Sequence, residues 1–170
     1  MATTIWIAYL LINFVLIPLL FLMRHRRWPL VVPIVPRHRY DLLEHGYGWL
    51  VTWFTIALLC EPPTTVDATI MARAAGGGLV LVGSAIIAAA VLTLGPNWRI
   101  GQDTSDALCA YVTAGIYRYV SHPIYWGMML VALGQTLLMS GDWRAIVLLA
   151  GTALYVVIQG RAELRRWQSA

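Results

Sequence analysis

The sequence predicts an all-α integral membrane bundle of about five transmembrane helices, with a cytoplasmic interfacial segment before helix 4. Of the 170 residues, 59% are hydrophobic and 12% are charged, whereas soluble domains carry about 25% charged residues. Disorder is also excluded, because it requires low hydrophobicity and high net charge. All 12 basic residues are arginines, so no lysine is present to form a Schiff base or a Walker motif.

Five apolar blocks account for the predicted helices, since a membrane-spanning helix needs about 20 apolar residues, or about 17 at the short end. They cover approximately residues 3–23, 42–60, 74–94, 123–140 and 143–160. Basic residues follow the first block and no small-residue cleavage site is present, so we expect a retained span rather than a signal peptide. Small residues in the third block predict close packing against another helix; they include Gly76, Gly77, Gly78, Gly83 and Ser84.

The arginines predict the orientation, because short cytoplasmic loops collect positive charge. In a five-span topology all but two of the 12 arginines lie on one side, and only Arg73 and Arg144 lie on the other. We therefore expect an external amino terminus, a cytoplasmic carboxyl terminus and a location in a bacterial inner membrane. The arginines are scattered between apolar blocks, so the net charge of +4 does not indicate nucleic-acid binding.

The two cysteines, Cys60 and Cys109, are predicted to lie at opposite membrane faces. The hydrocarbon core is about 30 Å thick, whereas a disulfide needs Cα atoms within about 7 Å, so we expect both thiols to be unpaired. The histidines and cysteines show no metal-ligand spacing, and no metal site is predicted. Asn13, in the first block, is expected to form an interhelical hydrogen bond.

Residues 95–123 form the longest polar interval between two blocks, and long connections in small proteins tend to carry function. Thr104 or Ser105 is expected to cap a short surface helix that ends near Ala110, and Gly115 suits the C-terminal end of that helix.

The end of this interval offers groups that suit a charged, aromatic ligand. Pro123 fits the first turn of the fourth span, and the free N–H groups there, with Arg118 and His122, make a site for a carboxylate or phosphate. Aromatic rings that could stack on a flat ring or face a cation follow closely: Tyr117, Tyr119, Tyr125 and Trp126. S-adenosylmethionine contains an anion, a ring and a cation. Tyrosine and tryptophan also gather at membrane interfaces, so a simple interfacial belt stays open.

Residues 115–127 resemble the signature Gly-Pro-Tyr-Arg-x-x-Arg-His-Pro-x-Tyr-x-Gly of the isoprenylcysteine carboxyl methyltransferase and phospholipid methyltransferase families. The matching positions are Gly115, Tyr117, Arg118, His122, Pro123, Tyr125 and Gly127. Residues 95–99 resemble the lead-in to this signature, and the likeness covers roughly residues 80–164. Ser121 stands where the families usually have arginine, and Glu163 is what remains of a Glu-Glu pair.

The resemblance implies S-adenosylmethionine-dependent methyl transfer to a hydrophobic, membrane-embedded acceptor, as in prenylcysteine carboxyl methylation. It implies catalytic roles for His122 and Glu163. It implies cofactor binding by Arg118, His122, Tyr125, Trp126 and Glu163. The implied partners are the bilayer and a lipid-like or prenylated acceptor, with no metal and no nucleic acid. We expect one membrane domain over residues 1–170, with three spans in residues 1–94 and the cofactor-binding segment and last two spans in residues 95–170.

The acceptor decides whether a general base is needed. A carboxylate acceptor needs none, whereas an amine or hydroxyl does, and His122, Glu163 and Glu44 are the candidates. Near the start of the second block, Glu44 could instead be a charge partner of nearby arginines. Ser121 and the short tail after Glu163 leave a non-catalytic membrane scaffold or partner-binding protein as the alternative. A membrane reductase is a weaker third option, since no dinucleotide-specific feature is present.

Overall fold

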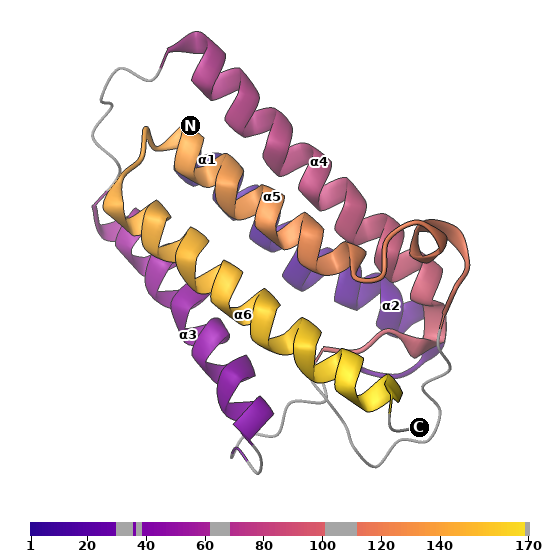
Figure 1. The fold of residues 1–170 in the computed structure, drawn as a ribbon. Helices are drawn as coiled ribbons and strands as arrows, with labels where there is room; N and C mark the ends of the chain where they lie inside the picture. The colour runs from indigo at the N-terminus through magenta and orange to yellow at the C-terminus, as the bar shows by residue number, and fades with distance from the viewer. Residues whose placement is uncertain (30–35, 37–38, 62–68, 101–111, 169–170) are drawn as a thin grey trace.

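The protein, described here from a computed structural model, is a bundle of helices that run side by side (Figure 1). The structure describes residues 1–29, 36, 39–61, 69–100 and 112–168, without the side chains of residues 39, 40 and 164–168. The α-helices are α1 (Ala2–Leu10), α2 (Ile17–His25), α3 (Arg39–Cys60), α4 (Ile70–Leu94), α5 (Pro123–Leu138) and α6 (Trp143–Gln168). A π-helical segment, Leu11–Leu16, joins α1 to α2, and 3-10 turns occupy Gly95–Asn97 and Gly115–Arg118. These residues form no strand, so the predicted all-α class is confirmed.

Each predicted apolar block corresponds to one helical stretch, with α1, the π-helical segment and α2 forming the first. Three stretches are long and apolar enough to cross a membrane: Ala2–His25, Ile70–Asn97 and Trp143–Glu163. The shorter apolar helix α5 has 16 residues. A membrane protein is therefore supported, while the number of spans stays a prediction.

The first helix widens into π geometry just before Pro18. Proline has no N–H to donate to the preceding turn and its ring crowds that turn, which favours a local bulge. Asn13 lies in the bulge, and its Nδ2 donates to the backbone oxygen of Tyr9 at 3.0 Å. The prediction that Asn13 forms an interhelical hydrogen bond is wrong. Its side chain bonds within its own helix, and its Oδ1 has no hydrogen-bond partner in the described part of the chain.

Glycine allows α4 and α5 to pack backbone against backbone. A Cβ atom at Gly83 would lie 2.6 Å from the backbone oxygen of Gly127, and one at Gly76 would lie 2.7 Å from that of Gly134. The reciprocal contacts are equally close, so neither helix has room for a side chain there. The predicted packing role is confirmed for Gly76 and Gly83, whereas a Cβ at Gly78 would have nothing within 4 Å.

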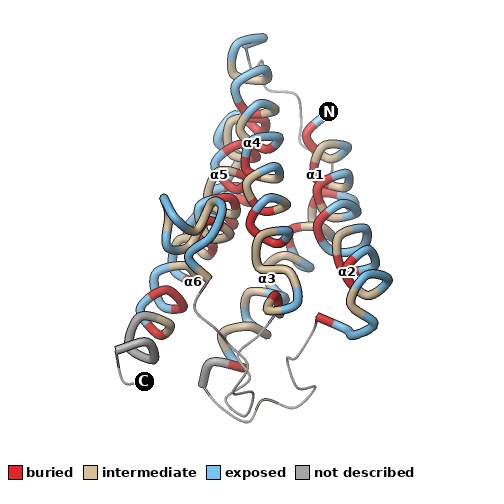
Figure 2. The backbone as a smooth tube through the Cα atoms, turned by 90° about the vertical axis from the view of Figure 1, so that its right-hand side faces the viewer, coloured by how far each residue is buried: buried red, intermediate tan, exposed pale blue. Residues whose placement is uncertain are grey.

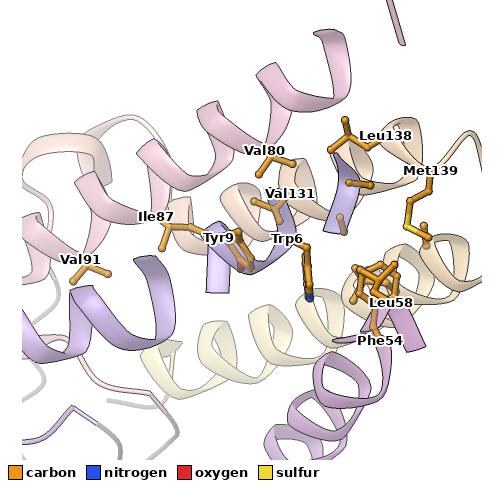
Figure 3. Packing of buried hydrophobic residues seen from close by; sticks show 14 of the residues in the cluster. Trp6, Tyr9, Phe54, Leu58, Val80, Ile87, Val91, Val131, Leu138 and Met139 are labelled. Carbon is orange, nitrogen blue, oxygen red and sulfur yellow. The ribbon is translucent and has the colours of Figure 1, made fainter. Parts of the chain in front are cut away.

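The apolar core lies between the helices. The ring of Trp6 meets Phe54 edge-on at 4.9 Å between centroids, and its Nε1 donates to the Thr55 hydroxyl at 2.9 Å. Figure 3 shows Val80 of α4 and Val131 of α5 close together in this core. Buried residues follow the inner faces of the helices, and exposed residues follow the outer faces (Figure 2). Large apolar side chains occur on those outer faces, which suits contact with lipid; they include Phe14, Ile56, Leu81, Leu92 and Leu154.

At one end of the bundle, Arg144 joins the start of α6 to the end of α3. Its guanidinium donates to the backbone oxygens of Ala57 at 3.1 Å and Glu61 at 2.6 Å, and to Asp142 Oδ2 at 2.7 Å. The hydrogen bonds from Arg144 hold the pKa of the Asp142 carboxyl below its usual range. Cys60, at the same end of α3, is exposed and is a free cysteine within the described residues. Cys109 lies outside those residues, so the separation of the two cysteines stays a prediction.

The predicted surface helix over residues 104–110 also lies outside the described residues. The expectation that Gly115 ends that helix is wrong, because residues 112–114 are not helical. Gly115 instead begins the 3-10 turn with φ +54°, and a Cβ there would lie 2.8 Å from the Thr93 hydroxyl oxygen. Its positive φ and its close approach to α4 explain the glycine.

Candidate functional site

Polar side chains gather where α5 begins and α6 approaches its end. His122 directly precedes α5 in an extended conformation, with φ −134° and ψ 64°, because Pro123 disfavours helical geometry in the residue before it. Tyr125 lies in the first turn of α5, and Glu163 lies in the last turns of α6. We call His122, Tyr125 and Glu163, together with their neighbours Glu44, Tyr155 and Gln159, the polar cluster.

Glu163 is held through both carboxylate oxygens. The Tyr125 hydroxyl donates to Oε1, and Nδ1 of His122 lies 3.1 Å from Oε2. The rings of His122 and Tyr125 stack at 5.5 Å between centroids with an interplanar angle of 27°. The structure thus brings together three side chains that the sequence predicted for one site.

The second ring nitrogen of His122 has no hydrogen-bonding group of the described structure opposite it. Nε2 is buried and has no hydrogen-bond partner among the described residues. A buried polar atom without a partner costs about 1–3 kcal/mol, which a ligand group could recover. The side chains of His122 and Glu163 are 24% and 32% exposed, so the cluster is open to its surroundings.

Glu44 of α3 joins the cluster through two donors from α6. The Tyr155 hydroxyl donates to Oε2 at 2.9 Å, and Nε2 of Gln159 donates to Oε1 at 2.7 Å. The Tyr155 ring stacks on Tyr47 of α3 at 4.4 Å and meets the Tyr125 ring edge-on at 6.2 Å. Two tyrosines in contact therefore connect Glu44 to the Glu163 side of the cluster.

Tyr47, Tyr155 and Gln159 were missed in the sequence analysis, although a signal was present. Thr152, Tyr155, Gln159 and Glu163 follow one another at spacings of three, four and four residues, which places them on one helix face. Tyr155 and Gln159 are only 8% and 2% exposed. Polar groups on the buried face of a membrane helix are costly and often functional.

Two of the predicted cofactor-binding residues, Arg118 and Trp126, lie at the surface. Arg118 is exposed at the end of the 3-10 turn, and Trp126 is 63% exposed. No side-chain contact in the described structure joins either of them to Glu163, so their role stays a prediction. Tyr117 is closer to the cluster: burial raises the pKa of its hydroxyl, and the charge of Glu163 adds to the rise.

The cluster combines two carboxylates, one imidazole and several tyrosine rings. Carboxylates accept hydrogen bonds from ammonium, hydroxyl and amide groups, and tyrosine faces attract cations. This arrangement suits a ligand that carries positive charge and N–H or O–H donors. Within the described residues, no group of three His, Cys, Asp or Glu side chains could hold a metal ion.

The family model described as phospholipid methyltransferase matches residues 71–165, which is more than half of the chain. The match includes almost all of α4, all of α5, and α6 as far as residue 165, and with them His122, Tyr125 and Glu163. Glu44 and Tyr47 lie outside it. Comparisons with curated proteins and with solved structures gave no match.

Proposed function

Since the chain belongs to the phospholipid methyltransferase family, we propose that it transfers the methyl group of S-adenosylmethionine to a hydrophobic acceptor that reaches the polar cluster from the bilayer. The observation that carries this proposal is the contact of His122 and Tyr125, from the family signature, with Glu163 of α6. Residues 38 and 41 positions apart in sequence form one open polar site at the end of a membrane bundle. Catalysis would consist mainly of holding both reactants in line and apart from water.

The residues present fit the cofactor. S-adenosylmethionine supplies a methyl group activated on a sulfonium. Glu163 would accept hydrogen bonds from the ammonium or the ribose hydroxyls, and the unpartnered Nε2 of His122 would bond to another polar group of the cofactor. Tyr125 would offer its ring, while Arg118 and Trp126 would contact the cofactor from the exposed side.

The negative charge of the two carboxylates in the cluster affects which chemical class of methyl acceptor can bind there. The sequence resemblance predicts a carboxylate, as in prenylcysteine methylation. A carboxylate would have to approach both Glu163 and Glu44, and like charges at close range repel. An amine headgroup would find hydrogen-bond acceptors and tyrosine faces instead, so the geometry favours an amine-bearing lipid.

We also propose that the cluster faces the cytoplasm of a bacterial cell. The helix ends at His25, Leu94 and Gln168 lie at the end of the bundle that carries the cluster (Figure 1). Arginines gather in the segments at these ends, and positive charge marks cytoplasmic loops.

The test measures isotope transfer from labelled S-adenosylmethionine to phosphatidylethanolamine and, separately, to N-acetyl-S-farnesylcysteine. The purified full-length protein should label the amine lipid and bind the cofactor by calorimetry. His122→Ala and Glu163→Gln should each weaken cofactor binding about tenfold or more, because a hydrogen bond to a charged group contributes about 1.5–3 kcal/mol. Glu61→Gln changes an exposed carboxylate at the opposite end of α3 and is the matched control.

Absence of both transfer and cofactor binding would overturn the proposal. The chain would then be a non-catalytic scaffold or partner-binding protein that retains the family fold, as Ser121 in place of the signature arginine suggests. Transfer to the farnesylated carboxylate alone would retain the methyltransferase and assign it the prenylcysteine-like acceptor.

A further inference from the structure

We propose that Glu44 is a further catalytic residue of this chain. Its carboxylate, with the free amide oxygen of Gln159, binds the N–H group of the acceptor and takes the proton that the acceptor must lose. The inference rests on the proposed methyl transfer to an amine lipid. It concerns α3, which lies outside the family match.

The Glu44 carboxylate is held in place by two hydrogen bonds and can accept further ones. A carboxylate has about four acceptor positions, and Tyr155 and Gln159 fill one on each oxygen, at 2.9 and 2.7 Å. Both donors come from α6, so the side chain is fixed across two helices. A carboxylate that is already ordered loses little freedom when it binds a further donor.

The amide oxygen of Gln159, next to the Glu44 carboxylate, has no hydrogen-bond donor among the described residues. The side chain is 2% exposed, and its Oε1 is buried without a hydrogen-bond partner in the described part of the chain. Since Nε2 of the same amide donates to Glu44, the free oxygen lies beside the Glu44 carboxylate. Two acceptors therefore lie together, and a ligand that satisfies both must bring hydrogen-bond donors, of which a primary ammonium carries three.

The other possible bases, Glu163 and His122, contact each other at the signature end of the cluster, where Tyr125 also donates to Glu163 and which fits the cofactor. Glu44 lies on the other side of the Tyr125–Tyr155 contact: Tyr125 donates to Glu163, Tyr155 donates to Glu44, and the centroids of the two rings are 6.2 Å apart. An amine held by Glu44 would thus lie next to the cofactor, with the stacked rings of Tyr47 and Tyr155 beside it.

The chemical step balances with these groups alone. Glu44 takes one proton from the primary ammonium of the acceptor and becomes a neutral carboxylic acid. The freed nitrogen lone pair forms a bond to the methyl carbon while the carbon–sulfur bond breaks and its electron pair stays on sulfur. The products are a secondary ammonium and a neutral thioether, and the total charge is unchanged.

The decisive variant is Glu44→Gln in the full-length protein. Cofactor affinity by calorimetry should match that of the wild type, while kcat for phosphatidylethanolamine near neutral pH should fall about 100-fold or more, as expected for loss of a general base. The deficit should shrink toward about pH 10, because an amine with a pKa near 10 then loses its proton to the solvent. A purely structural role for Glu44 would give a deficit that does not change with pH.

A second variant keeps the test valid if Glu44→Gln fails to fold. Gln159→Leu keeps the side chain's bulk but removes both the free Oε1 and the Nε2 donor to Glu44, so the KM for the amine lipid should rise about tenfold or more with cofactor affinity unchanged. Without cofactor, Glu44→Gln and Gln159→Leu should both bind dodecylamine more weakly than the wild type, by calorimetry. Glu61→Gln is again the control and should match the wild type in every measurement.

Wild-type transfer rates in Glu44→Gln, or a deficit independent of pH, would overturn this inference and leave the proposed function standing. A parallel loss of cofactor affinity in Glu44→Gln would do the same, because Glu44 would then belong to the cofactor site. If the wild type itself neither binds the cofactor nor transfers a methyl group, the proposed function fails and this inference fails with it.

Discussion

Glu163 makes two polar contacts through its two carboxylate oxygens, one to the Tyr125 hydroxyl and one to His122 Nδ1. A long acidic side chain held at both oxygens occupies one rotamer before any ligand arrives. Ordering a free side chain on binding costs about 0.5–1.5 kcal/mol, so the cluster would bind a charged ligand with that cost already met. The same reasoning makes Tyr125 a positioning residue for Glu163.

Tyr125→Phe should therefore weaken S-adenosylmethionine binding. The hydroxyl donor to Glu163 is lost, but the ring contacts with His122 and Tyr155 remain, so stability should change little. We expect a loss of affinity of about tenfold by calorimetry, since the hydrogen bond involves a charged partner. Tyr119→Phe is the control, because Tyr119 is 82% exposed. Equal losses in both variants would show that Tyr125 does not act through Glu163.

Many of the single residues of the candidate site could be predicted from the sequence. The others could not, and the reason is physical. His122, Tyr125 and Glu163 were predicted, because the first two match the family signature next to Pro123 and the third corresponds to a Glu-Glu pair that the resemblance implies after the last span. The partners of Glu44 lie 111 and 115 residues away, at Tyr155 and Gln159. Whether Glu44 contacts Tyr155 and Gln159 depends on how α3 and α6 are rotated about their axes. The spacing of residues within one helix does not specify this rotation.

Among the elements, α5 carries His122 and Tyr125, and its position is set by backbone contact with α4. Gly83 and Gly127 allow this approach, since a Cβ at either position would lie under 3 Å from the opposite backbone. Gly83→Leu should force the helices apart. Overpacking of this kind costs about 1–3 kcal/mol, and it should also displace the start of α5.

The measurement for Gly83→Leu is thermal unfolding in detergent combined with cofactor calorimetry, and both midpoint and affinity should fall. Gly78→Leu makes the same chemical change at an exposed position on α4, where a Cβ would have nothing within 4 Å, and should lower neither the midpoint nor the affinity. If Gly83→Leu unfolds at the wild-type temperature, the close approach of α4 and α5 is not needed for stability.

The Asp142–Arg144 pair at the other end of the bundle predicts a dependence of stability on pH. The pKa of Asp142 is lowered in the folded protein, mainly by hydrogen bonds from Arg144. Its contribution is complete above the unfolded pKa of about 3.9 and is lost as the pH falls through the lower folded value.

We therefore expect the unfolding midpoint of the wild type to fall more than that of Asp142→Asn when the pH is lowered from about 6 to about 3. At the higher pH the variant should already be less stable, because Arg144 has lost its charged partner. Parallel curves for the two proteins would contradict the assigned role of Asp142.

The helices themselves were largely predictable, because each apolar block is long enough to define one. The π-helical segment at Leu11–Leu16 was not predicted, although Pro18 was present in the block. A proline can bend, break or widen a helix, and the packing around it decides between these outcomes.

For the whole molecule, the reactivity of Cys60 tests the predicted orientation in the membrane directly. It is exposed at the end of α3 opposite the polar cluster. With Cys109→Ser as background, a membrane-impermeant maleimide should modify Cys60 on intact spheroplasts. In a Cys60→Ser, Cys109→Ser background, Ser169→Cys should react only after lysis. The reverse pattern would invert the predicted topology and place the cluster outside.

The shortness of α5 has a consequence for the surrounding lipid. Its 16 residues extend about 24 Å, whereas a hydrocarbon core measures about 30 Å. Its neighbour α4, with 25 residues, extends about 37 Å. Gly127 packs at the level of Gly83 and Ile87, so the first residues of α5 lie closer to the middle of the bundle than Leu94, where α4 ends. His122 is therefore also nearer to the middle of the bundle than the end of α4. Beside an α5 that spans the bilayer, a hydrophobic mismatch of this kind would favour a thinner membrane and would bring headgroups toward the cluster. The thickness of the host membrane would then control how easily an acceptor headgroup reaches the enzyme.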